Sequence, residues 1–380
     1  MFRLKRAMAF ILLVAAFLCR GNVSARELSE VTAKSVILME SSTGRVIYEC
    51  NADAPLPPAS ITKIMTLLLI MEDIESGKIG YNDIVTASER AKSMGGSTIY
   101  LDAGERMSVY DLVKGIVLAS AKDSCVAMAE HLEGTAEAFV ERMNRRASEL
   151  GMTNTVFKNT NGLPAEGHVM SARDIAIASN ELIKHKEIFN FTKIWTDSLR
   201  GGEFLLANTN KLIRFYEGAN GLKTGSTDEA GCCISATAER DGMQLIAVVL
   251  GSPTSEDRFS DAKALLDYGF GNYALWYGPG MSESLGNIAV KKGTRDSVSF
   301  SPATNMYALL KKGDSGRIEV VNETYEFITA PLKKGDIAGK IKCVIDGEVI
   351  AETNLTVNED VGKIGLWKMC MKTLAMLLRI

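Results

Sequence analysis

Two prolines, Pro57 and Pro58, followed by an apolar run from Ile64 to Met71, fix where one helix of this chain begins. Proline is tolerated at the entrance of a helix and not inside it, so we expect the helix to start near Ser60. Residues three apart share a helix face, so the Ser60 hydroxyl and the Lys63 amine should point toward the same spot. A serine hydroxyl becomes a good nucleophile when a base removes its proton. Lysine can be that base if burial or nearby cations lower its pKa.

A second segment of interest is a joint of small residues, Ala119 to Cys125, between two apolar helical stretches. Val109 to Leu118 has helical spacing before the joint, and Val126 to Leu132 predicts a second helix after it. Such a joint can present a polar side chain, here Ser120, inside a core. A plain turn between two helices would have the same composition.

A third segment precedes a predicted hairpin. The β-rich runs Gly231 to Arg240 and Met243 to Gly251 are joined by Asp-Gly, which is a strong hairpin signal. The sequence Lys223-Thr224-Gly225-Ser226 therefore lies on or beside a strand. Glycine there lets another backbone approach closely, and a lysine and a threonine can hold a carboxylate.

Each of these motifs is common by itself; a Ser-x-x-Lys helix, for example, often has a serine cap and a solvent-exposed lysine. Together, in this order and about 60 and about 100 residues apart, they resemble the serine penicillin-recognising enzymes. More narrowly, the chain is similar to the low-molecular-mass penicillin-binding proteins that are D-alanyl-D-alanine carboxypeptidases. Asn161-Gly162-Leu163, Gly167-His168 and Ser171 to Asp174 are also close to that family's sequence, and the resemblance covers residues 30–375.

The resemblance implies an α/β (α+β) fold, a serine β-lactamase/transpeptidase-like catalytic domain over residues 26–280. Its central antiparallel sheet would carry helices on both faces, with a mostly helical insertion that contains Ser120. Residues 281–360 are short β-rich runs between turns such as Asp346-Gly347, which predicts a small all-β domain. In the family such a domain is a stalk.

The resemblance also implies the chemistry. Ser60 would attack the carbonyl between the two terminal D-alanines of a peptidoglycan stem peptide, and Lys63 would take its proton. Ser120 would relay a proton toward the leaving D-alanine. Lys223 and Thr224 would bind the terminal carboxylate.

The backbone N–H groups of Ser60 and Ser226 would form the oxyanion hole beside Gly225. A β-lactam would mimic the substrate and leave a slow acyl-enzyme on the same serine. No metal and no organic cofactor is needed for this chemistry.

One position departs from the family. The middle motif is Ser-x-Asn there, whereas the third residue here is Lys122, which offers only donors and carries a charge. We assign Lys122 to substrate binding; its charge would help keep Lys63 neutral, but Lys122 could instead pair with Asp123 and swing away. This leaves a second hypothesis, a catalytically impaired peptidoglycan-binding homologue. A β-lactamase-like hydrolase is a third, weakened because Glu166 lacks the Glu-x-x-Leu-Asn setting of the deacylating base.

The charge distribution bears on location. Residues 1–25 and 361–380 each carry four positive charges and no acid, so a net charge of −3 leaves −11 on the body between them. An acidic body argues against a nucleic-acid partner. Basic residues, the apolar run Ala7 to Leu18 and the small residues Val23-Ser24-Ala25 predict a signal peptide over residues 1–25. A membrane-spanning anchor would need roughly 20 apolar residues, and this run has about twelve.

The tail, residues 361–380, places Lys368, Lys372 and Arg379 on one side of a helix and apolar residues on another. This pattern predicts an amphipathic helix that lies in a membrane surface, with a helix packed on the β domain as the alternative. We therefore expect an exported protein at the outer face of the cytoplasmic membrane. Six cysteines remain after cleavage, and we expect mostly free or buried thiols.

Overall fold

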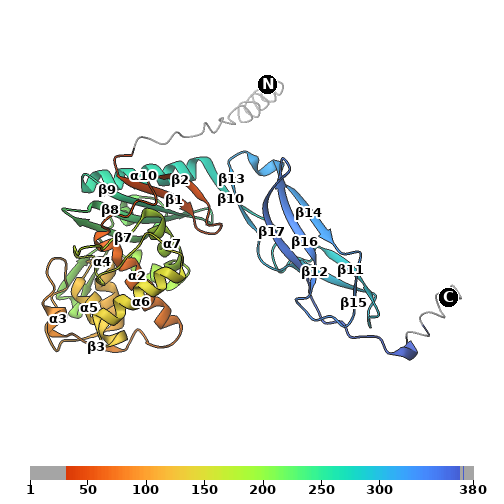
Figure 1. Ribbon diagram of the computed structural model, residues 1–380, viewed down its shortest axis with the longest axis horizontal. Helices are drawn as coiled ribbons and strands as arrows, with labels where there is room; N and C mark the ends of the chain where they lie inside the picture. Colours follow the sequence, from red (N-terminus) through yellow and green to blue (C-terminus); the bar gives the residue numbers. More distant parts are fainter. Residues whose placement is uncertain (1–30, 369–370, 372–380) are drawn as a thin grey trace, which may run out of the picture.

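The N-terminal domain is built on a five-stranded antiparallel sheet in the order β2-β1-β9-β8-β7 (Figure 1). The computed structural model describes residues 31–368 and residue 371. The strands of this sheet are β1 (Ser35–Glu40), β2 (Val46–Cys50), β7 (Ala219–Thr227), β8 (Gly231–Arg240) and β9 (Met243–Ser252). The predicted hairpin β8–β9 is confirmed, and β1 and β2 form a second antiparallel pair. Asp241 and Gly242 both have positive φ, as the tight turn between β8 and β9 requires.

Both faces of this sheet are covered, because side chains of a strand alternate between its two faces. Ile246, Val248 and Leu250 of β9 pack into the core under α2 (Lys63–Glu75) and α7 (Ala172–Leu182). The alternate β9 residues pack against α10 (Ser255–Asn272) on the other face. The helix α2, which follows Ser60, thus lies in the larger of the two cores that flank the sheet.

The remaining helices form a lobe beside the sheet (Figure 1). They are α3 (Glu89–Lys92), α4 (Val109–Leu118), α5 (Lys122–Glu133) and α6 (Ala136–Glu149). Ser120 lies between α4 and α5, as predicted. The helix α5 begins at Lys122, four residues before the predicted start, because the polar Lys-Asp-Ser segment forms its first turn.

Short elements complete the N-terminal domain. The small hairpins pair β3 (Ile84–Thr86) with β4 (Arg106–Ser108) and β5 (Thr196–Leu199) with β6 (Phe204–Ala207). The short helices are η1 (Ala59–Thr62), η2 (Lys186–Ile188), α8 (Phe189–Thr192), η3 (Arg200–Gly202) and α9 (Leu212–Phe215).

The C-terminal domain is a six-stranded sheet in the order β14-β16-β17-β12-β11-β15. Its strands are β11 (Gly286–Lys291), β12 (Ser297–Pro302), β14 (Glu319–Thr324), β15 (Phe327–Thr329), β16 (Ile337–Ile345) and β17 (Glu348–Val357), with η4 (Asp314–Arg317) between them. Phe300, Ile341 and Leu355 lie in its core. The predicted α/β layout with a C-terminal all-β domain is confirmed.

A pair of strands connects the two domains. β10 (Tyr273–Tyr277) follows α10 directly and pairs antiparallel with β13 (Tyr307–Lys311). Leu309 of β13 belongs to the core under α10, whereas Trp276 of β10 packs against the core of the β domain. Arg45 also donates to the Leu309 carbonyl at 3.1 Å.

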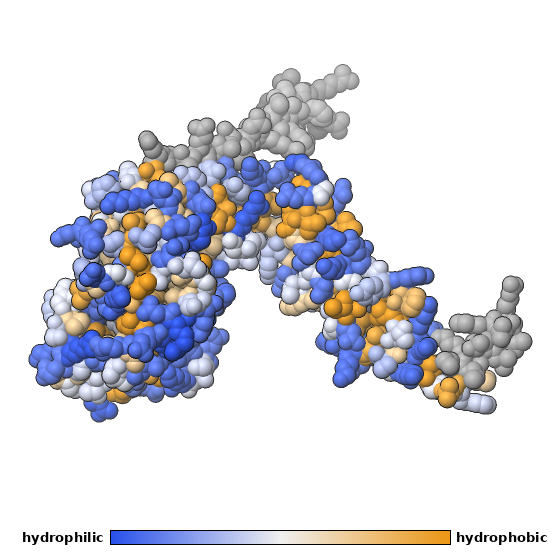
Figure 2. All heavy atoms as spheres, in the orientation of Figure 1, coloured by the Kyte–Doolittle hydropathy of each residue, from blue (hydrophilic) through white to orange (hydrophobic). Residues whose placement is uncertain are grey.

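Apolar side chains reach the surface in patches on the β domain, whereas the visible face of the N-terminal domain is mostly hydrophilic (Figure 2). Leu366 and Trp367, in the last described helical residues, are 78% and 79% exposed. The predicted signal peptide and most of the predicted tail helix lie outside the described residues. Within the described part, no helix is long and apolar enough to cross a membrane. The five cysteines located there are free thiols.

Candidate active site

Ser60 and Lys63 meet as their spacing predicts. Ser60 lies in η1, the tight turn that leads into α2, and Lys63 is the first residue of α2. The Lys63 Nζ donates to the Ser60 Oγ at 2.9 Å. A second bond, from the same Nζ to the Asn161 carbonyl at 2.5 Å, holds the amine in place.

Lys63 is completely buried, although it is a lysine. Burial lowers the pKa of the Lys63 amine to about 8, and the positive charge of Lys122 adds to the lowering. The neutral amine is therefore accessible close to neutral pH. A neutral amine 2.9 Å from a hydroxyl can accept the hydroxyl proton.

Ser120 is held in an unusual backbone conformation between α4 and α5. Its φ is +59°, which is uncommon for a residue other than glycine. The side chain is 5% exposed, and its Oγ has no hydrogen-bond partner within the described part of the chain. A buried hydroxyl without a partner is costly, and at this position it lines the same cleft as Ser60. The joint thus presents an unpartnered hydroxyl to the cleft.

Lys223 and Thr224 lie on β7 at the edge of the central sheet. Lys223 is buried behind the cleft, where its Nζ donates to the Thr224 carbonyl at 3.1 Å. Burial, and next the charge of Lys63, hold the pKa of Lys223 well below its usual range. The Thr224 hydroxyl donates to the Thr209 hydroxyl at 2.8 Å.

Gly225 allows β7 to approach the Ser60 turn. A Cβ atom on Gly225 would lie 2.8 Å from the Ser60 nitrogen, closer than side chains pack. The predicted close approach of a second backbone at this glycine is therefore confirmed.

The cleft that these residues form has a volume of about 150 Å³. Every predicted site residue except the buried Lys63 and Lys223 lines it. The lining residues are Ser60, Ser97, Ser120, Lys122, Gly162, Leu163, Thr209, Thr224, Gly225, Ser226, Thr227 and Arg258. No cluster of residues able to hold a metal occurs in the described part of the chain.

A family model described as D-alanyl-D-alanine carboxypeptidase matches residues 22–254 of this chain. The chain belongs to the D-alanyl-D-alanine carboxypeptidase family. A second model, for the C-terminal domain of penicillin-binding protein 5, matches residues 281–363. The family resemblance of the three motifs is confirmed.

Similar proteins cover nearly the whole chain. The D-alanyl-D-alanine carboxypeptidase DacF of Bacillus subtilis (strain 168) is 42% identical over 346 residues, 90% of this chain and 89% of the relative. The carboxypeptidase DacC of Escherichia coli (strain K12) is 32% identical over 378 residues, 95% of this chain and 91% of the relative. Crystal structures of penicillin-binding protein 5 from Haemophilus influenzae superpose with a TM-score of 0.79 at 31% identity, covering 89% of this chain and 100% of that chain.

Lys122, the departure from the carboxypeptidase pattern, turns toward the loop of residues 93–98. Its Nζ donates to the Gly95 carbonyl at 3.3 Å, and a Cβ on Gly96 would lie 2.2 Å from that Nζ. Lys122 is not paired with Asp123. The Asp123 carboxylate instead accepts from the backbone N–H groups of Ile99, Leu101 and Ser124 at 2.9–3.2 Å.

Some residues of this carboxypeptidase cleft were not identified from the sequence. Arg258 of α10 is 8% exposed, donates from Nη1 to the Gly225 carbonyl at 3.0 Å, and leaves its Nε without a partner among the described residues. The Asn161 carbonyl, which accepts from Lys63, and the Thr209 hydroxyl, which accepts from Thr224, are two more. A backbone carbonyl and contacts between distant segments leave no local signal in one sequence.

His168 connects two segments through both of its ring nitrogens. Its Nδ1 accepts from the Lys158 N–H at 2.9 Å, so its Nε2 carries the proton and donates to the Thr62 hydroxyl at 2.7 Å. Burial lowers the pKa of His168 to about 4, so the ring is neutral at neutral pH. Thr62 in turn donates to the Ala59 carbonyl at 2.9 Å, beside Ser60.

Gly162→Ala should greatly slow the reaction of Ser60 with a penicillin. Gly162 has φ +84°, and an added Cβ would lie 1.8 Å from the Ala59 carbonyl oxygen and 2.9 Å from the Ser60 nitrogen. The turn that carries Ser60 would have to move, and we expect at least about a 100-fold loss in the rate of acylation by a labelled penicillin.

Gly167→Ala is the matched control for this substitution. It has a similar positive φ, +73°, so it bears the same backbone strain, but its nearest neighbour is the Lys158 Cε at 3.5 Å. Equal acylation rates in the two variants would contradict the prediction.

Proposed function

We propose that this protein is a serine-type D-Ala-D-Ala carboxypeptidase, which removes the terminal D-alanine from peptidoglycan stem peptides. The observation that carries the proposal is the hydrogen bond from the buried Lys63 amine to the Ser60 hydroxyl. The names of the relatives, D-alanyl-D-alanine carboxypeptidases, support it.

In the proposed reaction, neutral Lys63 takes the Ser60 proton as the Ser60 oxygen bonds to the carbonyl carbon of the penultimate D-alanine. The N–H groups of Ser60 and Ser226 bind the oxyanion, an effect of roughly 3–4 kcal/mol per donor in other enzymes. Ser120 relays the proton from Lys63, passing its own hydroxyl proton to the amine of the leaving D-alanine as it accepts the Lys63 proton, and the C–N bond breaks. Water then hydrolyses the ester and restores the Ser60 hydroxyl.

We assign the binding of the substrate's terminal carboxylate to the side of the cleft where Thr224 lies. Thr224 presents a hydroxyl there, the Arg258 guanidinium lines the cleft, and the buried Lys223 amine lies behind it. A cation favours a bound carboxylate strongly when water is excluded. A β-lactam carries a carboxylate at the corresponding place, and the same contacts would orient it for acylation of Ser60.

The acylation rate should follow the protonation of Lys63. With the pKa of Lys63 at about 8, the rate with a labelled penicillin should rise about tenfold per pH unit below pH 8 and level off above it. Ser60→Ala should show no adduct by intact mass, whereas Ser76→Ala, at the far end of α2, should match the wild type. A rate independent of pH between about 6 and 9.5 would exclude Lys63 as the base.

Lys122 is proposed to position the substrate and to help keep Lys63 neutral. Lys122→Met and Lys122→Asn remove its charge, so the midpoint of the pH–rate profile should move to higher pH in both. The KM for a pentapeptide should change several-fold. An unchanged midpoint would refute the electrostatic role. If the wild type forms no adduct while Lys122→Asn does, the impaired peptidoglycan-binding homologue is the correct function.

The two ends of the chain are the basis for a proposed cellular location. Residues 1–25 would direct export, and residues 361–380 would hold the protein on the outer face of the cytoplasmic membrane as a surface helix. The mature protein should therefore sediment with anionic vesicles at low salt. A chain truncated after residue 360 should remain in the supernatant; equal sedimentation of both would refute the membrane role.

A further inference from the structure

Three segments of the C-terminal domain meet at the end where the described chain leaves it, far from the N-terminal domain (Figure 1). They are residues 291–296, 331–336 and 359–364. Val361, Gly362 and Ile364 form backbone hydrogen bonds of 2.8–3.0 Å with the other two segments. Segments that are distant in the sequence thus form one surface, which we call the basic end.

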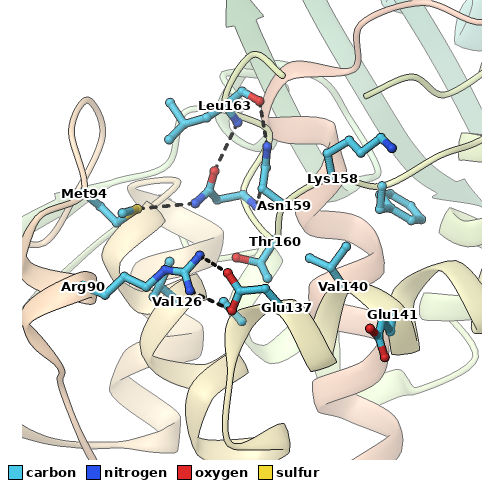
Figure 3. A pocket seen from close by; sticks show the side chains of 13 residues that line it. Arg90, Met94, Val126, Glu137, Val140, Glu141, Lys158, Asn159, Thr160 and Leu163 are labelled. Atoms are coloured by element: carbon cyan, nitrogen blue, oxygen red, sulfur yellow. Dashed lines mark hydrogen bonds and ion pairs between the residues drawn. The ribbon is translucent and has the colours of Figure 1, made fainter. Parts of the chain in front are cut away.

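Unpaired lysines are the main feature of the basic end. Four lysines there are exposed and form no ion pair with another residue in the described part of the chain: Lys292, Lys333, Lys334 and Lys363. Arg90 in the N-terminal domain shows the contrast, because its guanidinium pairs with the Glu137 carboxylate at 2.7 Å (Figure 3). The four lysine ammonium groups can therefore bind an external anion.

The acids of the basic end are engaged by neighbouring groups. Glu359 pairs with Arg295. The Asp336 and Asp360 carboxylates accept the backbone N–H groups of residues 333 and 334 at 2.8 and 2.7 Å. Counted over the three segments, cations outnumber acids six to four, in a protein whose body is acidic. The basic end therefore keeps an excess of positive charge.

Apolar side chains border these lysines. Ile337, directly after the second segment, is exposed, and so is Phe327, whose ring centroid lies 3.1 Å from the Lys291 Nζ. Trp367 follows the third segment and is also exposed. Cations beside aromatic and aliphatic side chains are typical of surfaces that meet the headgroup region of a membrane. A polyanion in water would require the cations alone.

We propose that the basic end binds the headgroups of an anionic lipid bilayer, as a second membrane contact beside the tail. The charges are complementary, and the chain leaves the domain toward the tail at this same end. This inference rests on the proposed location and adds a surface of the folded β domain to it. Each lysine beside an anionic surface strengthens binding about fivefold.

The tail and the basic end would act together. Stable anchoring at a membrane surface usually takes two signals, such as an apolar segment and a polybasic patch. A chain that ends at residue 360 loses both, because residues 361–364, which connect the other two segments, belong to the basic end. Point substitutions are therefore needed to separate the two contacts.

Vesicle binding of the full mature chain provides the test. Lys333→Gln combined with Lys334→Gln removes two of the lysines and leaves residues 361–380 unchanged. With vesicles of phosphatidylcholine and about one-third phosphatidylglycerol at low salt, this double variant should sediment about 25-fold more weakly than the wild type, about fivefold per lysine. With pure phosphatidylcholine vesicles the two proteins should bind equally, because the electrostatic contribution is absent.

Lys311→Gln combined with Lys312→Gln is the matched control. These two lysines are also adjacent and exposed, but the Lys312 N–H donates to the Asn272 carbonyl at 2.8 Å, at the end of the β domain that adjoins α10. The control removes the same charge from the same domain and should bind anionic vesicles within about twofold of the wild type. Both double variants should unfold at the wild-type temperature, which shows that the β domain is intact.

Equal binding of anionic vesicles by the wild type and the Lys333→Gln/Lys334→Gln variant would overturn the assignment, as would an equal loss in the control. If that variant instead lost binding of inorganic polyphosphate, or lost self-association in analytical ultracentrifugation, while vesicle binding stayed unchanged, the surface would belong to an anionic polymer or to a second copy. A wild type that does not bind anionic vesicles would refute the proposed location and this assignment with it.

Discussion

Lys63 is buried between a hydroxyl and a carbonyl oxygen, and much of the structure serves to keep it there. A lysine with no exposed surface is expensive unless it is neutral or well bonded. The Ser60 hydroxyl and the Asn161 carbonyl give its nitrogen two partners, and the closure of β7 on the Ser60 turn excludes water. That closure depends on two glycines, Gly162 and Gly225, which leave room for backbone against backbone. The fold thus supplies a base of suitable strength by burial, without a carboxylate partner.

Basic side chains cluster at the cleft, although the body of the protein is acidic. Lys63, Lys122, Lys223 and Arg258 all lie in or behind it, and the nearby acid, Asp123, is occupied by three backbone N–H groups. Burial lowers the pKa values of Lys63 and Lys223, and the charge of Lys122 adds to the lowering for Lys63 as the charge of Lys63 does for Lys223. An anionic end group of a substrate relieves this imbalance when it binds, which favours a carboxylate over a neutral amide at the same position.

Much of this architecture could be predicted from the sequence, because the signals that determine it lie within short segments of the chain. Pro57 and Pro58 locate the start of the Ser60 helix, Asp-Gly locates the β8–β9 turn, and Ser-x-x-Lys brings two side chains together through helical spacing alone. The three motifs then identified the family. Arg258 and the Asn161 carbonyl were missed, because their roles depend on contacts between distant segments. The early start of α5 was missed because its first turn is polar, and the orientation of Lys122 depended on Gly96, 26 positions earlier.

The pairing of β10 with β13 restrains how the two domains can move relative to each other. A single extended strand between domains can twist about its bonds, whereas two hydrogen-bonded strands resist twisting as a ribbon does. Tyr273 and Lys311 face each other at one end of this ribbon, and Tyr277 and Tyr307 at the other. The distance and direction from the β domain to the cleft are therefore restrained by two paired strands instead of one flexible segment.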